Sequence, residues 1–272
     1  MNTTKLDLNK LHPFAGHPYK VQDNEEMDAL VESIRMNGIL TPLNVRPLEN
    51  GEYEVISGHR RLYAAQKAGL ETVPAIILPM SRDEAAIAVV DSNLHREHLL
   101  PSEKAFAYKL KMEALNHQGV TSGQVGQKWS RDEVSDTDSG RQVQRYIRLT
   151  HLIPSILSMV DEGRIAFTPA VELSYLKEQE QQELAEEMAY ADATPSLSQA
   201  QRMREISRQG RLTTEAIYAI MSEEKANQKE RLKISMERIR RFFPKSYTTA
   251  QIEEAVVKLC ERDYRRRTDR DR

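Results

Sequence analysis

The sequence predicts an α+β domain at the N-terminus and helices from there to the end of the chain. Over residues 1–82, short runs of β-branched and apolar residues alternate with helical patterns. From Arg82 onward the helical period persists. The chain has 272 residues, enough for two or three domains with cores of their own. We expect these domains over residues 1–100, 101–212 and 213–272.

Helix caps, helix stops and extended apolar runs define the elements expected in the first domain. Asp23 or Asn24 is suited to cap the first helix, and Gly38 to end it. In chain order, we expect a helix over about residues 25–37, strands at 41–46, 53–56 and 73–78, and a helix from a cap at Asp83 to about Leu94.

The later elements are all expected to be helical. Capping boxes at Ser196 and Thr248 mark two helix starts, and Pro169 suits the first position of another helix. In chain order, helices are expected over about residues 101–118, twice within 121–150, from 168, over 177–190 and 196–210, from Thr213 or Thr214, and from Thr248.

Composition excludes several classes of protein. A single cysteine, Cys260, rules out an intramolecular disulfide framework and a cysteine-rich zinc site. No apolar run approaches the roughly 20 residues of a membrane span. The N-terminal segment MNTTKLDLNKLHPF lacks the apolar core of a secretory signal. We therefore expect a cytoplasmic protein without a membrane contact.

The distribution of charge is uneven, although the net charge is only −2. Residues 1–100 carry 10 Lys and Arg against 14 Asp and Glu, and residues 101–200 carry 10 against 15. Residues 201–272 carry 19 against 12 and are therefore net basic. A basic end on an acidic body favours a polyanionic partner, and the alternative is a solvated helical tail with internal salt bridges.

The segment YEVISGHRRLYAAQKA, residues 53–68, reads as a strand, a glycine turn and a helix. Gly58 permits a sharp turn, and Arg60 and Arg61 fall in the first turn of the helix. Cations are disfavoured there by the helix dipole unless an anion is bound. Free N–H groups and two guanidinium groups predict a phosphate site. The alternative is a pair of solvated arginines.

A second polar cluster, DSNLHR, closes the following helix at residues 91–96. Asn93 and Arg96 are three residues apart and share a helix face. The amide oxygen suits a hard cation such as Mg²⁺, and the guanidinium suits a phosphate. The alternative is a polar helix end before a linker.

A third cluster, SGRQVQRYIRLT, residues 139–150, predicts a DNA-reading helix. Its three arginines fall within about 60° of each other on a helical wheel, opposite the apolar positions. Arginine and glutamine are well suited to reading guanine and adenine edges in the major groove. The preceding segment, 121–136, is expected to be the supporting helix of a helix-turn-helix. The alternative is an amphipathic surface helix. The expected DNA contacts are Ser139, Arg141, Gln142, Gln144, Arg145 and Arg148.

With these stretches in order, the chain resembles the ParB family of DNA-partition proteins. The resemblance begins near His17 and covers about residues 10–175, through HPYKV, TPLNVR, SGHRRLYAA, DSNLHREHLLPSEKAFAYK and QVQRYIRL. The later stretches TPSLSQAQRMREIS and FFPKSYTTAQIEEAV resemble members carried on plasmids or conjugative elements of Gram-positive bacteria.

The resemblance implies a sulfiredoxin-like N-terminal domain that binds CTP with Mg²⁺. It also implies a helix-turn-helix domain that reads a palindromic site in double-stranded DNA, and a C-terminal region that forms a homodimer. CTP lets the N-terminal domains of such a dimer engage, so that it closes on DNA as a clamp. A ParA-like ATPase is the usual partner, and the nucleoid is the expected location.

Mapped onto this chain, the resemblance assigns a set of residues to the nucleotide. The expected triphosphate contacts are Gly58, His59, Arg60 and Arg61. Asn93 and Arg96 are expected to contact the metal and the phosphates, with Asn93 as the metal ligand. The segment from Thr41 to Arg46 is expected to border the base.

Three departures from the family pattern stand out. His59 replaces the glutamate of the family's GERR turn, Ser92 replaces the glutamate of its ENxxR motif, and Gln22 lies near the place of an early arginine. Losing a carboxylate ligand weakens Mg²⁺ binding and any hydrolysis that needs it. We therefore name no catalytic residue. Two alternatives stay open: a CTP hydrolase or phosphotransferase of the same fold, and a transcriptional regulator of a mobile element.

Overall fold

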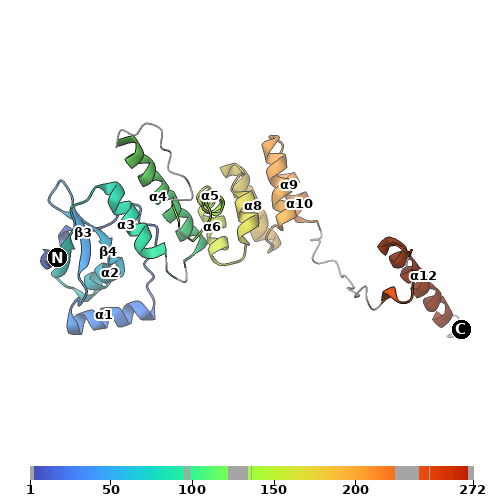
Figure 1. The fold of residues 1–272 in the computed structure, drawn as a ribbon, viewed down its shortest axis with the longest axis horizontal. Helices are drawn as coiled ribbons and strands as arrows, with labels where there is room; N and C mark the ends of the chain where they lie inside the picture. The colour runs from blue at the N-terminus through green and yellow to red at the C-terminus, as the bar shows by residue number, and fades with distance from the viewer. Residues whose placement is uncertain are drawn as a thin grey trace. The chain divides into compact units, whose positions relative to one another are not determined.

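The computed structural model of the chain describes residues 3–94, 96, 99–121, 134–135, 137–223, 239–244 and 246–268. These fall into two compact units, Met1–Glu223 and Glu224–Arg272. In the first unit a small sheet with three helices precedes a series of further helices (Figure 1). The predicted α+β domain followed by helices is therefore confirmed.

The sheet of the described chain has the strand order β1-β5-β3-β4-β2. The pairs β1–β5 and β3–β4 are antiparallel, and the pairs β5–β3 and β4–β2 are parallel. The strands are β1 (Thr3–Asp7), β2 (Leu11–Pro13), β3 (Leu43–Pro47), β4 (Tyr53–Ser57) and β5 (Thr72–Ile77).

The two strands at the sheet edges were not expected from the sequence. β1 and β2 each bury one side chain, Leu6 and Leu11, and the short 3-10 helix Leu8–Lys10 joins them. A strand that buries only one side chain does not show the alternation of apolar and polar residues by which strands are recognised in a sequence. The three inner strands each bury at least two side chains and were predicted.

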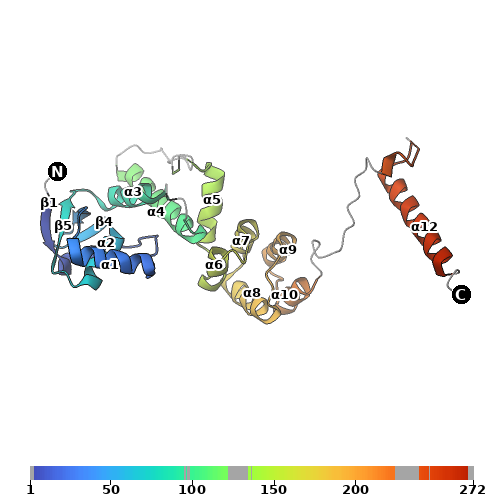
Figure 2. The same cartoon turned by 90° about the horizontal axis from the view of Figure 1, so that it is seen from below.

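The two faces of the sheet are covered by different helices, because successive strand residues point to opposite faces. Val55 packs in one core with Leu62 and Ala65 of α2 (His59–Ala68), and α1 (Glu25–Asn37) packs in turn on α2. Ile56 packs in another core with Val89 of α3 (Arg82–Leu94). Figure 2 shows α1 and α2 side by side next to β4.

The ends of α1 agree with the prediction, whereas the start of α3 does not. Asn24 Oδ1 accepts a hydrogen bond from Met27 N, and Gly38 ends α1 with a φ of 68°. The predicted cap of α3 at Asp83 is wrong. Ser81 and Glu84 form a reciprocal capping box instead, since Ser81 Oγ accepts from Glu84 N and Glu84 accepts from Ser81 N.

The helices of the first unit after α3 share one apolar core that includes Ile156, Leu173, Leu184, Met203 and Ile217. They are α4 (Pro101–Thr121), α5 (Gly140–Leu149), α6 (Pro154–Asp161), α7 (Phe167–Leu173), α8 (Glu178–Ala191), α9 (Leu197–Arg208) and α10 (Thr214–Met221).

Three details of these helices differ from the sequence prediction. α4 continues through Gly119, which a helix tolerates at a cost of about 1 kcal/mol. α7 begins at Phe167, so that Pro169 occupies its third position rather than its first. α6 was not predicted as a separate helix. Of the predicted supporting helix at 121–136, residues 122–133 and 136 lie outside the described residues.

The second unit contains α12 (Thr249–Thr268), which opens with the predicted capping box, since Thr248 N donates to Gln251 Oε1 at 2.8 Å. Ile252 is buried, whereas Val257 and Leu259 are about half exposed. No described helix of either unit has both the length and the apolar character needed to cross a bilayer.

Candidate functional site

The connection between β4 and α2 is a turn that suits glycine alone. Gly58 has a φ of 107°, in the left-handed region that L side chains rarely adopt. A Cβ atom here would also lie 3.1 Å from Arg61 Nη2 and 3.2 Å from Leu43 Cγ. The turn is tight because the chain passes directly from a buried strand into a helix.

The start of α2 is arranged to receive an anion. Gly58 supplies no side-chain cap, and the first turn holds no acidic residue. The first hydrogen bond of the helix runs from Leu62 N to Gly58 O, so the preceding N–H groups have no acceptor within the helix. Their partial positive charge, together with the two arginines, attracts a negative group.

The two arginines of this turn are held differently. Arg60 Nη2 lies 3.2 Å from Glu26 Oε2 in an exposed ion pair, which contributes little energy and is easily exchanged. Arg61 Nη1 donates to the carbonyl oxygens of Thr41 and Pro42, and burial lowers the pKa of its guanidinium. Arg61 is therefore fixed in place, while Arg60 is able to exchange Glu26 for another anionic partner.

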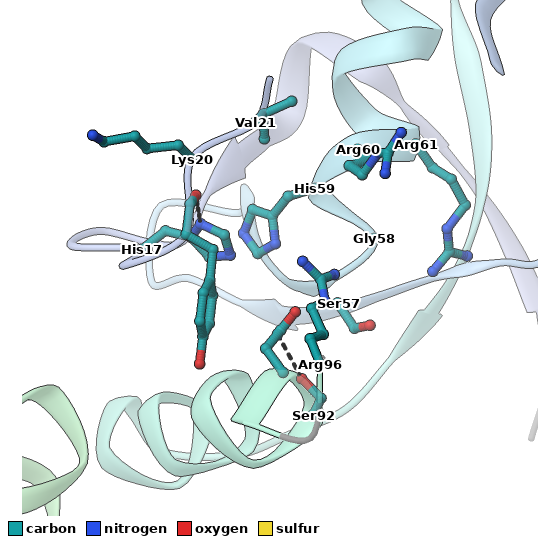
Figure 3. Close-up of a pocket in the computed structure, with 12 residues that line it drawn as sticks. His17, Lys20, Val21, Ser57, Gly58, His59, Arg60, Arg61, Ser92 and Arg96 are labelled. Carbon is teal, nitrogen blue, oxygen red and sulfur yellow. Dashed lines mark hydrogen bonds between the residues drawn. The ribbon is translucent and has the colours of Figure 1, made fainter. Parts of the chain in front are cut away.

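His59 stacks on His17, with ring centroids 3.6 Å apart (Figure 3). Phe14 N donates to His59 Nε2 at 3.3 Å, so this nitrogen carries no proton. Burial, and secondarily the neighbouring His17, lower the pKa of His59 to about 3. His59 is thus a neutral ring that ties the segment after β2 to the start of α2.

The end of α3 supplies the opposite wall. Asn93 is 8% exposed, and its Nδ2 donates to Val89 O at 2.8 Å and to Ser92 Oγ at 3.1 Å. The amide oxygen remains as the atom able to bind a cation. Arg96 lies over the Tyr19 ring, 5.9 Å from its centroid. Asp91 points elsewhere, as predicted, since its Oδ1 lies 2.5 Å from Lys111 Nζ.

These walls enclose a cavity of about 250 Å³. Six of the eight predicted nucleotide contacts line it together. Four belong to the Gly58 turn, and Asn93 and Arg96 lie at and just after the end of α3; Figure 3 shows Arg96 facing the turn. Its lining is His17, Tyr19, Lys20, Val21, Ser57, Gly58, His59, Arg60, Arg61, Ser92, Asn93 and Arg96.

The other two predicted contacts, Thr41 and Arg46, do not line the cavity. Thr41 serves through its carbonyl oxygen, which holds Arg61. Arg46 Nε lies 2.7 Å from Glu54 Oε2 in a buried ion pair, and Glu54 Oε1 accepts from Ala15 N. Thr41 therefore supports the Gly58 turn through Arg61, and Arg46 supports the segment after β2 through Glu54.

The segment from His17 to Val21 was missed as part of the site. In the sequence, HPYKV offered only the beginning of a resemblance, because its partners lie far along the chain. Tyr19 OH donates to Val90 O, and Lys20 N donates to Glu103 Oε1. Only the fold brings these residues to the cavity.

The chemistry of the lining fits a polyphosphate. Among the described lining residues, four are cations, from three separate segments, and none is a carboxylate. No group of three or more His, Cys, Asp or Glu among the described residues is placed to hold a metal ion. Of the described lining residues, Asn93 would hold Mg²⁺ through its amide oxygen, and the remaining ligands would come from phosphates and water.

The predicted DNA-reading helix is α5, and the segment before it is anchored on α4. Tyr108 is fully buried, and its OH donates to Asp138 Oδ2 at 2.5 Å. Lys104 Nζ lies 2.6 Å from the same carboxylate. Ser139 caps α5 by accepting from Gln142 N. The N-terminus of α5 is therefore held in one orientation.

The three arginines of α5 differ in their surroundings. Arg141 is exposed. Arg145 Nη2 donates to Thr168 Oγ1 at 2.9 Å, and its guanidinium lies over the Phe167 ring. The arginine face predicted to be free is therefore partly packed against the start of α7.

Arg148 is the most enclosed of the three. It donates to the side-chain and backbone oxygens of Ser174 and lies 4.0 Å from the centre of the Tyr175 ring. Arg204 of α9 also stacks on Tyr175, at 3.7 Å, and pairs with Glu172. Burial lowers the pKa of Arg148. Arg148 thus joins α5 to the end of α7.

The fold and the cavity define a small α+β domain, joined to a helical region, whose glycine turn at the start of α2 is suited to bind phosphate. Residues 1–94 match the family described as the ParB N-terminal domain. The chain therefore carries a ParB N-terminal domain, and the resemblance expected from the sequence is confirmed. Its expected origin on a mobile element of Gram-positive bacteria stays a prediction.

Two relatives illustrate the similarity. A nucleoid occlusion protein of Listeria innocua is 32% identical over 178 residues, which cover 65% of this chain and 59% of that protein. A chromosome-partitioning protein Spo0J of Thermus thermophilus is 34% identical over 161 residues, which cover 59% of this chain and 55% of that protein. The matches thus span less than two thirds of the relatives' own length.

Two solved structures of a C-terminally truncated chromosome-partitioning protein ParB from Caulobacter crescentus are also similar. The one complexed to the centromeric parS site has a TM-score of 0.42 and 22% identity, covering 76% of this chain and 99% of that chain. The one complexed with CTP-γ-S has a TM-score of 0.33 and 25% identity, covering 70% and 99%.

Proposed function

We propose that this protein is a dimeric, site-specific DNA-binding protein of the partition type whose N-terminal domain responds to CTP. The observation that carries the proposal is the cavity at the Gly58 turn, lined by four cations and by no described carboxylate, in a domain of the ParB N-terminal family. The names of the two relatives, nucleoid occlusion and chromosome partitioning, favour a role on the nucleoid.

The phosphates would bind at the start of α2, with Arg61 as the fixed cation and Arg60 as the adaptable one. Arg96 would close the other side, and His59 would support the turn without a charge of its own. Mg²⁺ would be held by the phosphates and by the Asn93 oxygen, as the fit of the lining residues suggests. Thr41 and Arg46 would act indirectly, by holding Arg61 and Glu54.

The DNA contacts would come from α5 within a helix-turn-helix. Exposure of Ser139 and Arg141 at the anchored start of this helix supports phosphate and base contacts there. Gln142, Gln144 and Arg145 follow along the same helix, and Arg148 would hold its end against α7. A palindromic site in double-stranded DNA is the target that fits a dimer.

Functionally, we divide the chain into residues 1–100, 101–212 and 213–272 as nucleotide-binding, DNA-binding and dimerising parts. α10 packs on α8 and α9, so the central part extends structurally to Met221. The half-exposed Val257 and Leu259 on α12 support a dimer contact in the last part. Closure of the dimer as a clamp and a ParA-like ATPase partner belong to the same proposal.

Genomic footprinting of the bound protein, followed by titration of the purified dimer with each nucleoside triphosphate, tests this function. We expect a local peak at a palindrome that spreads along the DNA only with CTP. A local peak that never spreads, with no nucleotide binding, favours a plain transcriptional regulator. CTP turnover is disfavoured because Ser92 supplies no carboxylate, and a phosphate-release assay with and without cognate DNA checks it.

A further inference from the structure

Lys20 lies between the nucleotide cavity and the helical region. It is the only Lys or Arg in residues 14–24, the segment that joins β2 to α1. Lys20 is one of the residues that line the cavity, and Figure 3 shows its amino group turned away from the arginines of the Gly58 turn. The amino group lies instead 3.7 Å from Asp161 Oδ2, at the end of α6.

Asp161 does not depend on Lys20 to satisfy its charge. Its carboxylate is only 9% exposed, and it accepts hydrogen bonds from Ser102 N at 2.9 Å and from Ser102 Oγ at 2.6 Å. Ser102 is the second residue of α4, whose N-terminal dipole favours a negative charge. Removal of the lysine therefore leaves no buried carboxylate without a partner.

The backbone of Lys20 is fixed while its side chain is not. Glu103 accepts from Lys20 N at 2.9 Å through Oε1 and from Leu100 N at 3.1 Å through Oε2. The Lys20 side chain, in contrast, is 68% exposed and makes an ion pair of modest energy with Asp161. Rotation about its flexible stem exchanges one anionic partner for another at little cost.

We infer that Lys20 has two alternative partners: Asp161 in the ligand-free protein, and a phosphate of a polyphosphate ligand when one is bound. This inference rests on the proposed nucleotide function of the same cavity. Asp161, a residue of the helical region, then competes with the ligand for one cation and lowers the affinity of the cavity. The ligand class is a nucleoside triphosphate or inorganic triphosphate, since the ammonium recognises the phosphates only.

Isothermal titration of the full chain with CTP and with inorganic triphosphate tests the exchange. Lys20→Ala is expected to weaken binding of both ligands by about 3- to 10-fold, which is the loss of one adaptable cation. Asp161→Asn is expected to strengthen binding by about 2- to 5-fold, because the lysine is released. In the Lys20→Ala background, Asp161→Asn is expected to have no effect. Lys10→Ala is the matched control, since Lys10 pairs with Asp7 and does not line the cavity.

A second variant guards against a folding defect in Asp161→Asn. Ser102→Ala removes the hydroxyl that shares the Asp161 carboxylate, so the carboxylate holds Lys20 more strongly. This variant is expected to weaken triphosphate binding by about 2-fold, opposite to Asp161→Asn. Equal melting temperatures of the variants confirm that each one folds.

The outcomes separate this inference from the proposed function. If Asp161→Asn leaves the triphosphate affinity unchanged, Asp161 does not compete with the ligand for Lys20. The same conclusion follows if Asp161→Asn raises the affinity equally in the unmodified chain and in the Lys20→Ala background. Unchanged affinity in Lys20→Ala, combined with a loss in Arg61→Ala, also overturns the competition and leaves the nucleotide function intact. Absence of triphosphate and CTP binding by the unmodified chain overturns the nucleotide function itself.

Discussion

The imidazole rings of His17 and His59 stack at the edge of the cavity with centroids 3.6 Å apart and a tilt of 35°. His17 comes from the segment after β2, and His59 opens α2, so the pair joins two walls of the site. Burial lowers the pKa of both rings, and charge on His17 further lowers the pKa of His59. The buried stack therefore favours the neutral rings.

Acidification is expected to destabilise the N-terminal domain through this pair. The pKa of His59 is about 3 in the folded protein, against about 6.5 in the unfolded chain, so the unfolded state binds the proton first. The free energy of unfolding should fall as the pH drops from about 6.5 toward 3, by up to about 1.4 kcal/mol per pH unit for one group. Urea unfolding at pH 7 and pH 5 measures this slope.

His59→Gln should make the slope shallower. If this variant keeps the slope of the unmodified chain, the histidine pair does not control the acid sensitivity.

Replacement of Gly58 by alanine should damage both folding and nucleotide binding. Alanine at a φ of 107° is strained, and its Cβ meets Arg61 Nη2 and Leu43 Cγ at about the distances already given. We expect a loss of about 1–3 kcal/mol in the free energy of unfolding and a CTP affinity at least about 10-fold weaker, since Arg61 is displaced. Chemical denaturation and calorimetry measure the two effects.

Gly69→Ala is the control for this change. Gly69 ends the same helix with a φ of 77°, but a Cβ there would meet nothing within 4 Å. This variant should lose stability from backbone strain and keep its CTP affinity. Equal loss of affinity in both variants would show that the close approach at Gly58 is irrelevant.

Local signals in the sequence were sufficient for the glycine turn and for α1. Asn24 and Gly38 act on residues of their own helix, and Gly58 is required by the backbone of its own turn. Arg60 and Arg61 were placed correctly for the same reason, because the first turn of a helix follows from where the strand ends.

Features set by distant partners could not be predicted in this way. The partner of Lys20 N is Glu103, 83 residues later, and the partner of Arg148 is Ser174, 26 residues later. Periodicity places Arg148 on a polar face but does not show that another helix covers that face. The resemblance placed Arg46 at the border of the nucleotide base, whereas the structure pairs it with the buried Glu54 on the neighbouring strand β4, a pairing that composition alone does not reveal.

Ser92→Glu should introduce the carboxylate that the cavity lacks. Ser92 and Asn93 both line the cavity at the end of α3. A glutamate there adds an anionic oxygen ligand for Mg²⁺ beside the Asn93 amide, so CTP binding should become strongly Mg²⁺-dependent. Calorimetry with and without Mg²⁺ measures the change, and a phosphate-release assay shows whether hydrolysis appears.

Asp91→Glu is the matched control, because Asp91 pairs with Lys111 and does not line the cavity. Its Mg²⁺ dependence should equal that of the unmodified chain. Strong Mg²⁺ dependence already present in the unmodified chain would contradict the view that Ser92 weakens metal binding.

Arg141→Ala should weaken binding to the specific DNA site by about 10- to 100-fold and leave the melting temperature unchanged. Arg141 is exposed on the first turn of α5, two residues after the Ser139 cap. Fluorescence anisotropy with the footprinted site and with random DNA of equal length provides the comparison. An equal loss on both DNAs would assign Arg141 to the phosphate backbone.

Arg145→Ala should likewise weaken binding to the specific site far more than to random DNA. The difference between the two DNAs should be smaller than for Arg141→Ala, because Thr168 and Phe167 already hold the Arg145 side chain. The same anisotropy series measures it. Equal losses on the two DNAs would place Arg145 on the phosphate backbone as well.

Arg148→Ala should instead act first on stability. Its guanidinium bonds Ser174 and stacks on Tyr175, so truncation removes a half-buried charged hydrogen-bond network worth about 1–3 kcal/mol. α5 then loses its hold on α7, and specific DNA binding should fall as a consequence. Urea unfolding and the anisotropy assay measure the two effects.

Tyr175→Ala separates the two roles of Arg148. It removes the ring between Arg148 and Arg204 but leaves both charges in place. If Arg148 acts by holding α5, Tyr175→Ala should reproduce a large part of both the stability loss and the loss of DNA affinity. If Arg148 instead leaves Ser174 to contact DNA directly, Tyr175→Ala should lower stability while DNA affinity stays the same or rises, because the arginine is then released toward the groove.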